Sequence, residues 1–335
     1  MQAQQASVSP SKIFDALMAH QQSDALKAAI ELDLFTAVGE GHTTAADLAR
    51  RCNASPRGVR ILADYLTIRG FLTKQDDRYG LAEDSAFFLN RNSPAYLGGV
   101  HEFLASDYVR EWGRNLSAAV RKGGSAVPEN GAVTPEHPMW VTFARAMMPM
   151  MMPIAQQLAA HAGQGPLKVL DIAAGHGIFG IVLAQSNPEA QVVQLDWPNV
   201  LQVARENAAK FGVQNRISYI EGSAFTQDYG SGYDLVLLTN FLHHFDVPVN
   251  ETLLRKVHAA LKPGGRAMTA EFVPNDDRIS PPQAAAFALN MLAGTDSGDA
   301  YTFAEFDQMF RNAGFKRSEK FDLLPTPQSL IVSYR

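Results

Sequence analysis

Cysteine and long apolar runs are scarce in this sequence. Cys52 is the only cysteine among 335 residues, which excludes an internal disulfide and a cysteine cluster for a metal. No apolar run is long enough to span a bilayer. The polar segment 1–12 lacks the charged start and apolar core of a secretory signal. These absences predict a cytoplasmic protein with no membrane partner.

An excess of positive charge is also absent. The chain has 29 Lys and Arg residues against 34 Asp and Glu residues, a formal net charge of −5, and no basic tract stands out. A nucleic-acid surface normally needs clustered basic residues, so we expect no nucleic-acid partner. The length is sufficient for more than one domain with a core of its own.

The segment 167–180 carries the strongest local pattern in the chain. Its first six residues form an apolar run interrupted only by Lys168 and Asp171, which is typical of a buried parallel strand. Gly175 and Gly177 then end the strand, and helical spacing resumes at residue 178. This order predicts a nucleotide-type cradle at the carboxyl end of a sheet.

Two chemistries fit such a cradle. The spacing Gly175-x-Gly177-x-x-Gly180 matches the dinucleotide fingerprint, which keeps an NAD-dependent oxidoreductase as one alternative. Asp171 favours the other chemistry, because a carboxylate four residues before the first glycine suits a cationic ligand. S-adenosylmethionine, with its amino group and sulfonium, is such a ligand.

The N-terminal part has the order of a winged helix. Helical spacing runs over 13–38, a capped helix begins at Thr44, and a third helix spans Pro56–Arg69. Two short strands joined by a polar turn follow in 71–82. A DNA-binding regulator with Arg57, Arg60 and Arg69 on its recognition helix is therefore a second alternative. A dimer interface is favoured instead, because the first helix is too apolar for a solvated surface.

The remainder alternates strands and helices, as an α/β domain does. Strands are expected at 191–195, 217–220, 233–239 and 266–272, helices at 200–211, 253–261 and 303–312, and a terminal antiparallel hairpin at 320–324 and 329–334. Asp196 follows the second strand of the cradle, where an acid can accept two ribose hydroxyls.

At these residues the whole chain resembles the plant-type O-methyltransferases, a family of class I S-adenosylmethionine-dependent enzymes. The likeness lies in Asp171-x-x-x-Gly175-x-Gly177, Leu195-Asp196, the segment 261–265 and the segment 270–274. It implies an α/β fold with a Rossmann-like sheet of seven strands, the last one antiparallel, after a mainly helical winged-helix dimerisation domain. The expected regions are a dimerisation domain (1–100), a helical linker with pocket residues (101–163) and a cofactor-binding methyltransferase domain (164–335).

The resemblance also implies an activity and a set of site residues. It implies methyl transfer from S-adenosylmethionine to a hydroxyl of a small aromatic, phenolic acceptor by a homodimer. His243 falls on the general base and Glu271 on the acid that assists it. The expected cofactor residues are Asp171, Gly175, Gly177, Asp196, Trp197, Ser223, Ala224, Phe225 and Asn240; the expected acceptor residues are Met147, Met151, Phe287 and Met291.

The sequence departs from the family pattern at four places. Ser223 replaces an acid in the adenine stretch, and Thr239 replaces a lysine before the catalytic histidine. His244 replaces the acid that usually follows that histidine, and a second family acid falls on Ala300, beside Asp299. The acceptor therefore stays open, and C- or N-methylation on the same scaffold is an alternative.

The expected chemistry follows from two neighbouring strand ends. Adjacent parallel strands lie about 4.8 Å apart, so His243 and Glu271 can reach one point at the carboxyl edge of the sheet. A histidine held by a carboxylate is a suitable general base. Phenols titrate near 10 and histidine near 6.5, so complete proton transfer costs about 5 kcal/mol, which a nearby sulfonium lowers. A metal held by His243, His244 and Glu271 is a weaker alternative, and no metal is expected.

Overall fold

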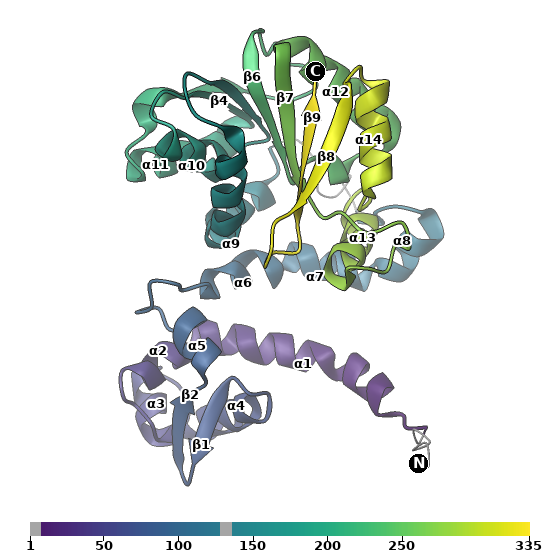
Figure 1. The fold of residues 1–335 in the computed structure, drawn as a ribbon. Helices are drawn as coiled ribbons and strands as arrows, with labels where there is room; N and C mark the ends of the chain where they lie inside the picture. Colours follow the sequence, from purple (N-terminus) through teal and green to yellow (C-terminus); the bar gives the residue numbers. More distant parts are fainter. Residues whose placement is uncertain (1–7, 128–135) are drawn as a thin grey trace, which may run out of the picture. The chain divides into compact units, whose positions relative to one another are not determined.

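The computed structural model describes residues 8–127 and 136–335. The chain divides into two compact units, Met1–Ala105 and Ser106–Arg335 (Figure 1). The first unit includes the expected dimerisation domain. The division of the second unit at residue 163, into a linker and a methyltransferase domain, stays a prediction.

The first unit contains short helices and one two-stranded hairpin. Thr44 accepts a hydrogen bond from the Asp47 backbone and Ser55 accepts one from Gly58, so both expected helix starts are capped. The elements are α1 (Ser11–Glu31), α2 (Leu34–Gly39), α3 (Ala45–Arg51), α4 (Pro56–Ile68), β1 (Leu72–Gln75), β2 (Arg78–Leu81), α5 (Glu83–Phe88), η1 (Gly98–Val100) and α6 (His101–Leu104).

The expectation of continuous helix over 13–38 is wrong in one respect. Asp33 adopts the left-handed conformation with φ +56°, which ends α1 and starts α2. The buried core of this unit lies around α2, α3 and α4. The first half of α1 stays outside it, with Ile13, Phe14 and Leu17 each more than 60% exposed.

The second unit is built on a seven-stranded sheet in the order β5-β4-β3-β6-β7-β9-β8. β9 runs antiparallel to both of its neighbours, β7 and β8, while the other neighbouring strands run parallel, as expected for the last strand. The strands are β3 (Lys168–Ile172), β4 (Gln191–Asp196), β5 (Ile217–Glu221), β6 (Tyr233–Thr239), β7 (Leu261–Glu271), β8 (Arg317–Asp322) and β9 (Ser329–Tyr334).

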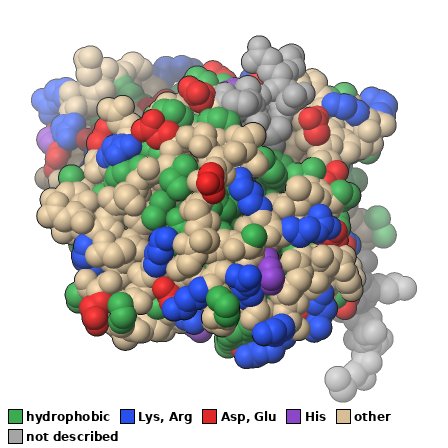
Figure 2. Space-filling model, turned by 90° about the horizontal axis from the view of Figure 1, so that it is seen from above, with side chains coloured by type: hydrophobic (Ala, Val, Ile, Leu, Met, Phe, Trp, Pro, Cys, Tyr) green, Lys and Arg blue, Asp and Glu red, His purple; other side chains and the backbone are tan. Residues whose placement is uncertain are grey.

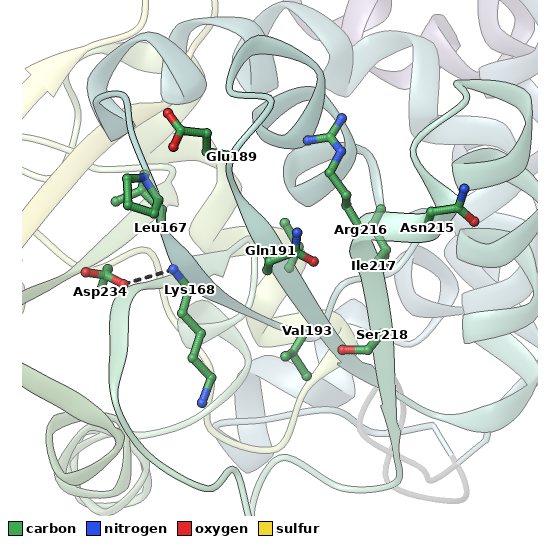
Figure 3. A pocket seen from close by; sticks show the side chains of 12 residues that line it. Leu167, Lys168, Glu189, Gln191, Val193, Asn215, Arg216, Ile217, Ser218 and Asp234 are labelled. Carbon is green, nitrogen blue, oxygen red and sulfur yellow. Dashed lines mark hydrogen bonds between the residues drawn. The ribbon is translucent and has the colours of Figure 1, made fainter.

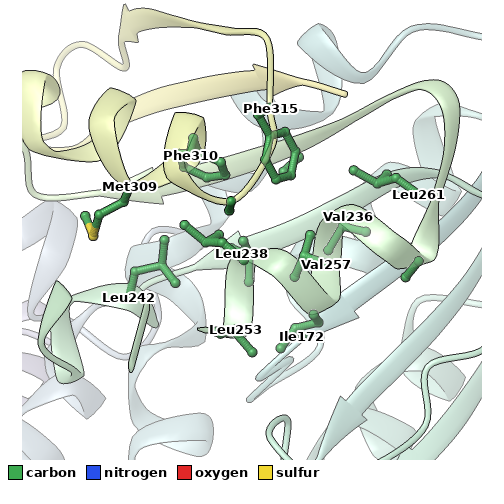
Figure 4. Close-up of a cluster of buried hydrophobic side chains, with 14 of the residues drawn as sticks. Ile172, Val236, Leu238, Leu242, Leu253, Val257, Leu261, Met309, Phe310 and Phe315 are labelled. Carbon is green, nitrogen blue, oxygen red and sulfur yellow. The ribbon is translucent and has the colours of Figure 1, made fainter. Parts of the chain in front are cut away.

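Helices cover both faces of this sheet (Figure 1). The helices of this unit are α7 (Asp107–Arg114), α8 (Leu116–Lys122), α9 (Pro138–Ala162), α10 (Ile178–Ser186), α11 (Pro198–Lys210), α12 (Val247–Ala260), α13 (Pro282–Gly294) and α14 (Phe303–Asn312), with short 3₁₀ turns η3 (Gln214–Arg216) and η4 (Leu242–His244). On one face, Leu238 packs in a buried cluster with Leu253 of α12 and Phe310 of α14 (Figure 4). This core holds the strand ends that carry the expected site.

Two expected starts are wrong by five residues or more, and the strand expected at 320–324 lies at Arg317–Asp322. The helix expected at 253–261 begins at Val247, because Asp246 caps the Val249 backbone N–H at 2.9 Å and Pro248 is tolerated in a first helical turn. The strand expected at 266–272 begins at Leu261, since Leu261 pairs with Tyr233 across a register shift. The Lys-Pro-Gly-Gly segment therefore belongs to β7.

The surface carries both signs of charge. Figure 2 shows acidic and basic side chains interspersed with apolar and uncharged ones over the face that it presents. Among the helices of residues 8–127 and 136–335, none is long and apolar enough to cross a membrane.

Candidate active site

The glycine turn after β3 has one open side and one packed side. Gly175 and Gly177 both have positive φ angles, +58° and +76°. A Cβ atom on Gly175 would meet only the Ala173 carbonyl oxygen, at 3.9 Å, whereas one on Gly177 would lie 3.0 Å from the Ala204 Cβ. Gly175 therefore leaves room beside the backbone, and Gly177 allows the turn to pack against α11.

Asp171 lies beneath this turn and is fully buried. Its Oδ2 accepts from the Gly180 N–H at 3.2 Å and from Gln194 Nε2 at 3.3 Å. Its Oδ1 has no hydrogen-bond partner within the part of the chain that the structure describes. Burial raises the pKa of this carboxyl to about 7.

Gln194 belongs to the same arrangement and was missed from the sequence. It is fully buried in β4, directly beside Asp171 in the strand register. Its Nε2 also donates to the Gly177 carbonyl at 2.8 Å, so Gln194 links the glycine turn to β4. A polar residue within the apolar segment 192–195 was the signal available in the sequence.

Asp196 closes the other side of the turn. Its Oδ2 accepts from the Gly175 N–H at 2.8 Å and its Oδ1 from the Trp197 N–H at 2.7 Å. Burial raises its pKa to about 6. A carboxylate oxygen has a second lone pair, so each oxygen can still accept a hydroxyl. Trp197 then begins α11 and packs against a small apolar cluster with Ala144.

The stretch 223–225 follows β5 and meets the residues after β6. Ser223 Oγ accepts from the Phe225 N–H at 3.2 Å. The Phe225 ring is partly exposed, and its centroid lies 5.0 Å from that of Phe245 and 6.4 Å from that of Phe241. This is an aromatic surface at the strand ends, beside buried Ala224.

His243 and Glu271 meet as expected. The His243 Nδ1 lies 2.5 Å from Glu271 Oε2, with His243 5% exposed and Glu271 fully buried. The other oxygen, Oε1, accepts from the backbone N–H groups of Phe241 and Leu242, both at 2.9 Å. The carboxylate is thus fixed by two backbone donors, and it directs Nδ1 of His243 inward and leaves Nε2 as the outward nitrogen.

Aromatic rings surround this pair. The ring centroid of Phe287, on α13, lies 4.8 Å from that of His243. The Phe287 ring also stacks on the Phe272 ring, with their centroids 4.0 Å apart. The His244 centroid lies 4.3 Å from that of His243 and 5.4 Å from that of Trp140. Burial and the neighbouring His243 hold the pKa of His244 well below its usual value, so this ring is neutral.

Three expected acceptor residues are buried methionines. Met147 and Met151 lie on α9 and Met291 on α13. Met151 Sδ lies 3.7 Å from Asn240 Nδ2, which brings an acceptor residue against a cofactor residue. The Asn240 amide oxygen accepts from Gln328 Nε2, a partner that was not expected from the sequence.

The family's second acidic position is Ala300 here, and the carboxylate of its neighbour Asp299 is directed elsewhere. The Asp299 carboxylate pairs with Arg278 at 3.3 Å, and only its backbone N–H reaches the His243 carbonyl, at 3.0 Å. Ala300 is fully buried. Of these acids, Glu271 is the one that contacts the His243 ring.

A separate pocket lies at the opposite edge of the sheet (Figure 3). Its volume is about 520 Å³, and its lining includes Lys168, Gln191 and Ile217, the first residues of β3, β4 and β5. Asp234, one of its charged groups, accepts from the Lys168 backbone at 2.9 Å and pairs with Lys262. The expected site residues follow the other ends of these strands.

Comparison with known proteins decides the family. Residues 132–316 match the O-methyltransferase domain, and residues 13–91 match the O-methyltransferase dimerisation domain. The chain belongs to the O-methyltransferase family. It is an S-adenosylmethionine-dependent enzyme, which decides against the dinucleotide and DNA-binding alternatives.

Relatives of this O-methyltransferase span its whole length. It is 30% identical over 312 residues to the 3-hydroxy-5-methyl-1-naphthoate 3-O-methyltransferase of Streptomyces sahachiroi, covering 91% of this chain and 89% of the relative. A crystal structure assigned as an O-methyltransferase of Nostoc punctiforme has 52% identity and a TM-score of 0.95, with 98% and 100% of the chains covered. The S-adenosyl-L-methionine-dependent PigF of Serratia, solved with S-adenosylhomocysteine, has 25% identity, a TM-score of 0.85 and coverage of 98% and 100%.

The residues of this O-methyltransferase fit its cofactor. The space beside Gly175 accommodates a ligand close to the backbone, and the unpartnered buried Oδ1 of Asp171 suits a cationic or donor group. The remaining lone pairs of Asp196 suit two hydroxyls.

Proposed function

We propose that this enzyme methylates a hydroxyl group of a small aromatic acceptor, with His243 as general base. The observation that carries the proposal is the 2.5 Å contact between His243 Nδ1 and Glu271 Oε2. This contact selects the tautomer in which Nδ1 carries the proton and Nε2 is a free base.

Glu271 is the positioning residue of this pair. Its Oε1 is held by two backbone N–H groups, so its Oε2 is aimed at His243 without freedom to turn. When His243 takes the acceptor's proton, the carboxylate stabilises the imidazolium that forms. The acceptor oxygen is then the nucleophile, held in place by the pocket.

The cofactor, when bound, supplies a methyl group activated by a sulfonium. Asp196 would hold its ribose, the stretch 223–225 its adenine, and Gly175 and Asp171 the backbone side of the cradle. Trp197, Gly177 and Asn240 complete the proposed cofactor residues.

The acceptor side of the pocket favours a flat aromatic compound. Phe287 stands edge-on to His243, and Met147, Met151 and Met291 supply buried thioethers, whose contacts with aromatic rings contribute about 0.3–1.5 kcal/mol each. The Streptomyces sahachiroi relative acts on a hydroxynaphthoate, which supports the same class of acceptor. We also propose that the enzyme is a homodimer, because its first unit matches the family's dimerisation domain.

The test is a screen of phenols, hydroxyindoles and hydroxynaphthalenes with methyl-labelled S-adenosylmethionine. The same screen is repeated with His243→Asn, and binding of S-adenosylhomocysteine to both proteins is measured by calorimetry. We expect labelled ethers from the wild type, and a loss of about 10²–10⁴ in kcat for the variant with unchanged binding. Full activity of His243→Asn would show that proximity to the cofactor is sufficient. Label on carbon or nitrogen of the acceptor would show that the enzyme is a C- or N-methyltransferase instead.

A further inference from the structure

Two side-chain amides meet at the carboxyl edge of the sheet. Asn240 follows β6, Gln328 precedes β9, and the Gln328 Nε2 donates to the Asn240 Oδ1. Gln328 is 2% exposed, and its Oε1 has no hydrogen-bond partner among residues 8–127 and 136–335. A buried amide at this place is costly unless its polar atoms are used.

The backbone of Asn240 is held on the His243–Glu271 side of the sheet. Asn240 has a φ of +54°, a left-handed conformation that asparagine tolerates better than most residues. Its N–H donates to the Ala270 carbonyl at 2.9 Å, beside Glu271 on β7. β7 lies on the opposite side of β6 from β3 and β4, so Asn240 is anchored away from Asp196.

Gln328 decides which end of the Asn240 amide is available. Because Oδ1 accepts from Gln328, the NH₂ end is directed elsewhere, to a point 3.7 Å from the Met151 sulfur. A thioether is a weak acceptor, so the two N–H groups of this amide are poorly used. Met151 is one of the proposed acceptor residues, which places this donor beside the acceptor pocket.

We propose that Gln328 and Asn240 form a specificity element that selects acceptors carrying a carbonyl oxygen. Gln328 is the positioning residue, and the Asn240 Nδ2 donates to the carbonyl of an aromatic hydroxyl compound. This inference rests on the proposed function, moves the Asn240 amide from the cofactor residues to the acceptor side, and defines the acceptor class more narrowly. A site built around a buried donor discriminates against analogues that leave the donor unpaired.

The test uses three sets of phenols that differ in one substituent. Hydroxyacetophenones carry a carbonyl acceptor, aminophenols carry a donor and ethylphenols carry neither, and all positional isomers of each are used. We expect the wild type to favour the best hydroxyacetophenone over the matching ethylphenol by about tenfold in kcat/KM, the value of one good hydrogen bond.

Gln328→Met removes the donor with little change of volume. It should abolish the preference, because KM for the hydroxyacetophenone should rise by about tenfold more than KM for the matching ethylphenol. Gln157→Met is the matched control, because Gln157 Nε2 reaches the same hairpin loop at the Leu323 carbonyl, 3.4 Å away, without contacting Asn240. The control should retain the preference. An unchanged preference in Gln328→Met, or an equal loss in Gln157→Met, would overturn the proposal.

Asn240→Asp is the second variant, and it is assayed if a thermal melt shows that Gln328→Met does not fold. It keeps an oxygen for Gln328 and replaces the NH₂ group by an acceptor, so the preference should pass to aminophenols. Continued preference for hydroxyacetophenones would contradict the proposal.

A failure of the proposed function gives a different result. If no phenol is methylated, calorimetry on the S-adenosylhomocysteine complex decides the inference alone. Tighter binding of a hydroxyacetophenone than of its ethylphenol, lost in Gln328→Met, would support the amide pair. Equal affinity in the wild type would refute it.

Discussion

At the scale of single residues, the site combines carboxylates in two different environments. Glu271 is buried but surrounded by donors, two from the backbone and one from His243. Asp171 is buried with one oxygen unpartnered in the described structure, and its pKa is raised to about 7. The same functional group is therefore held by three hydrogen-bond partners in one place and left partly unpartnered in the other, where burial raises its pKa.

Glu271→Gln should impair the proposed base without removing it. The amide oxygen can still accept from the backbone, but the amide NH₂ then faces His243 Nδ1 and favours the tautomer with the proton on Nε2. We expect kcat to fall by about 10²–10⁴, as when a general base is lost. Steady-state kinetics measure this, with S-adenosylhomocysteine affinity as the control. A kcat within a factor of about two of wild type would contradict the assigned role.

Asp171→Asn should change how stability depends on pH. Asp171 has a folded pKa of about 7 against an ordinary value of 3.8, so the folded state binds the proton more tightly. Its stabilising effect is complete below pH 4 and is lost as the pH rises to 7, by at most about 4 kcal/mol. The variant lacks this loss, so its stability relative to wild type should increase between pH 4 and 7.

Denaturant unfolding of both proteins in the absence of cofactor measures that difference. The two stability curves must be compared with each other, because the titration of His176 changes the stability of both proteins with pH in the opposite direction. Burial lowers its pKa to about 4, so its contribution weakens stability as the pH falls below 6.5. A variant curve parallel to that of wild type would show that Asp171 is ionised throughout this range.

At the scale of elements, the glycine turn between β3 and α10 has separable functions. Gly175 borders open space, whereas a Cβ on Gly180 would lie 2.8 Å from Val192 Cγ1 and 2.9 Å from Asp171 Oδ2. The absence of a side chain at Gly175 therefore leaves room for the ligand, whereas its absence at Gly180 allows the helix to pack against the sheet.

Alanine at the two positions should separate these functions. Gly175→Ala should cost about 1–2 kcal/mol for its positive φ and weaken S-adenosylhomocysteine binding strongly. Gly180→Ala should destabilise by about 1–3 kcal/mol through overpacking. Thermal melts and calorimetry measure the two effects. If Gly175→Ala bound S-adenosylhomocysteine as wild type does, the ligand would not approach this backbone.

At the scale of the whole molecule, two units carry different surfaces. The second unit buries its sheet under helices on both faces, while α1 of the first unit presents Ile13, Phe14 and Leu17 to solvent. A row of exposed apolar side chains on one helix needs a partner surface. The dimerisation-domain match makes a second copy of the chain the proposed partner.

Phe14→Glu with Leu17→Glu should therefore convert a dimer into a monomer. Buried apolar surface would be replaced by charges of one sign at the two-fold interface. Light scattering at micromolar concentration measures the mass. Ile279→Glu is the control, because Ile279 is 75% exposed on a loop of the second unit, and it should leave the dimer intact. A wild-type monomer would refute the proposed assembly.

Much of this molecule follows from local sequence patterns. The strand, turn and helix around Gly175, the caps at Thr44 and Ser55, and the terminal hairpin are short-range features, so periodicity and turn chemistry predict them. The His243–Glu271 contact was also predictable, because the family resemblance places both residues at the carboxyl edge of neighbouring strands, with Glu271 at the end of β7 and His243 in η4, just after β6. The start of α12 was missed, since it depends on one capping aspartate before a proline.

Tertiary structure alone decided the partners of buried polar groups. Gln194 lies beside Asp171 only because β3 and β4 pair in one particular register. Gln328 reaches Asn240, and Asn240 reaches Met151, across long separations in the chain. Sequence periodicity assigns a residue to a face of an element, whereas a hydrogen bond depends on the relative position of two elements to within about an ångström. For that reason motif spacing and periodicity were sufficient for the fold and for the His243–Glu271 contact, whereas the packed structure was needed to show what holds the glycine turn and what orients the Asn240 amide.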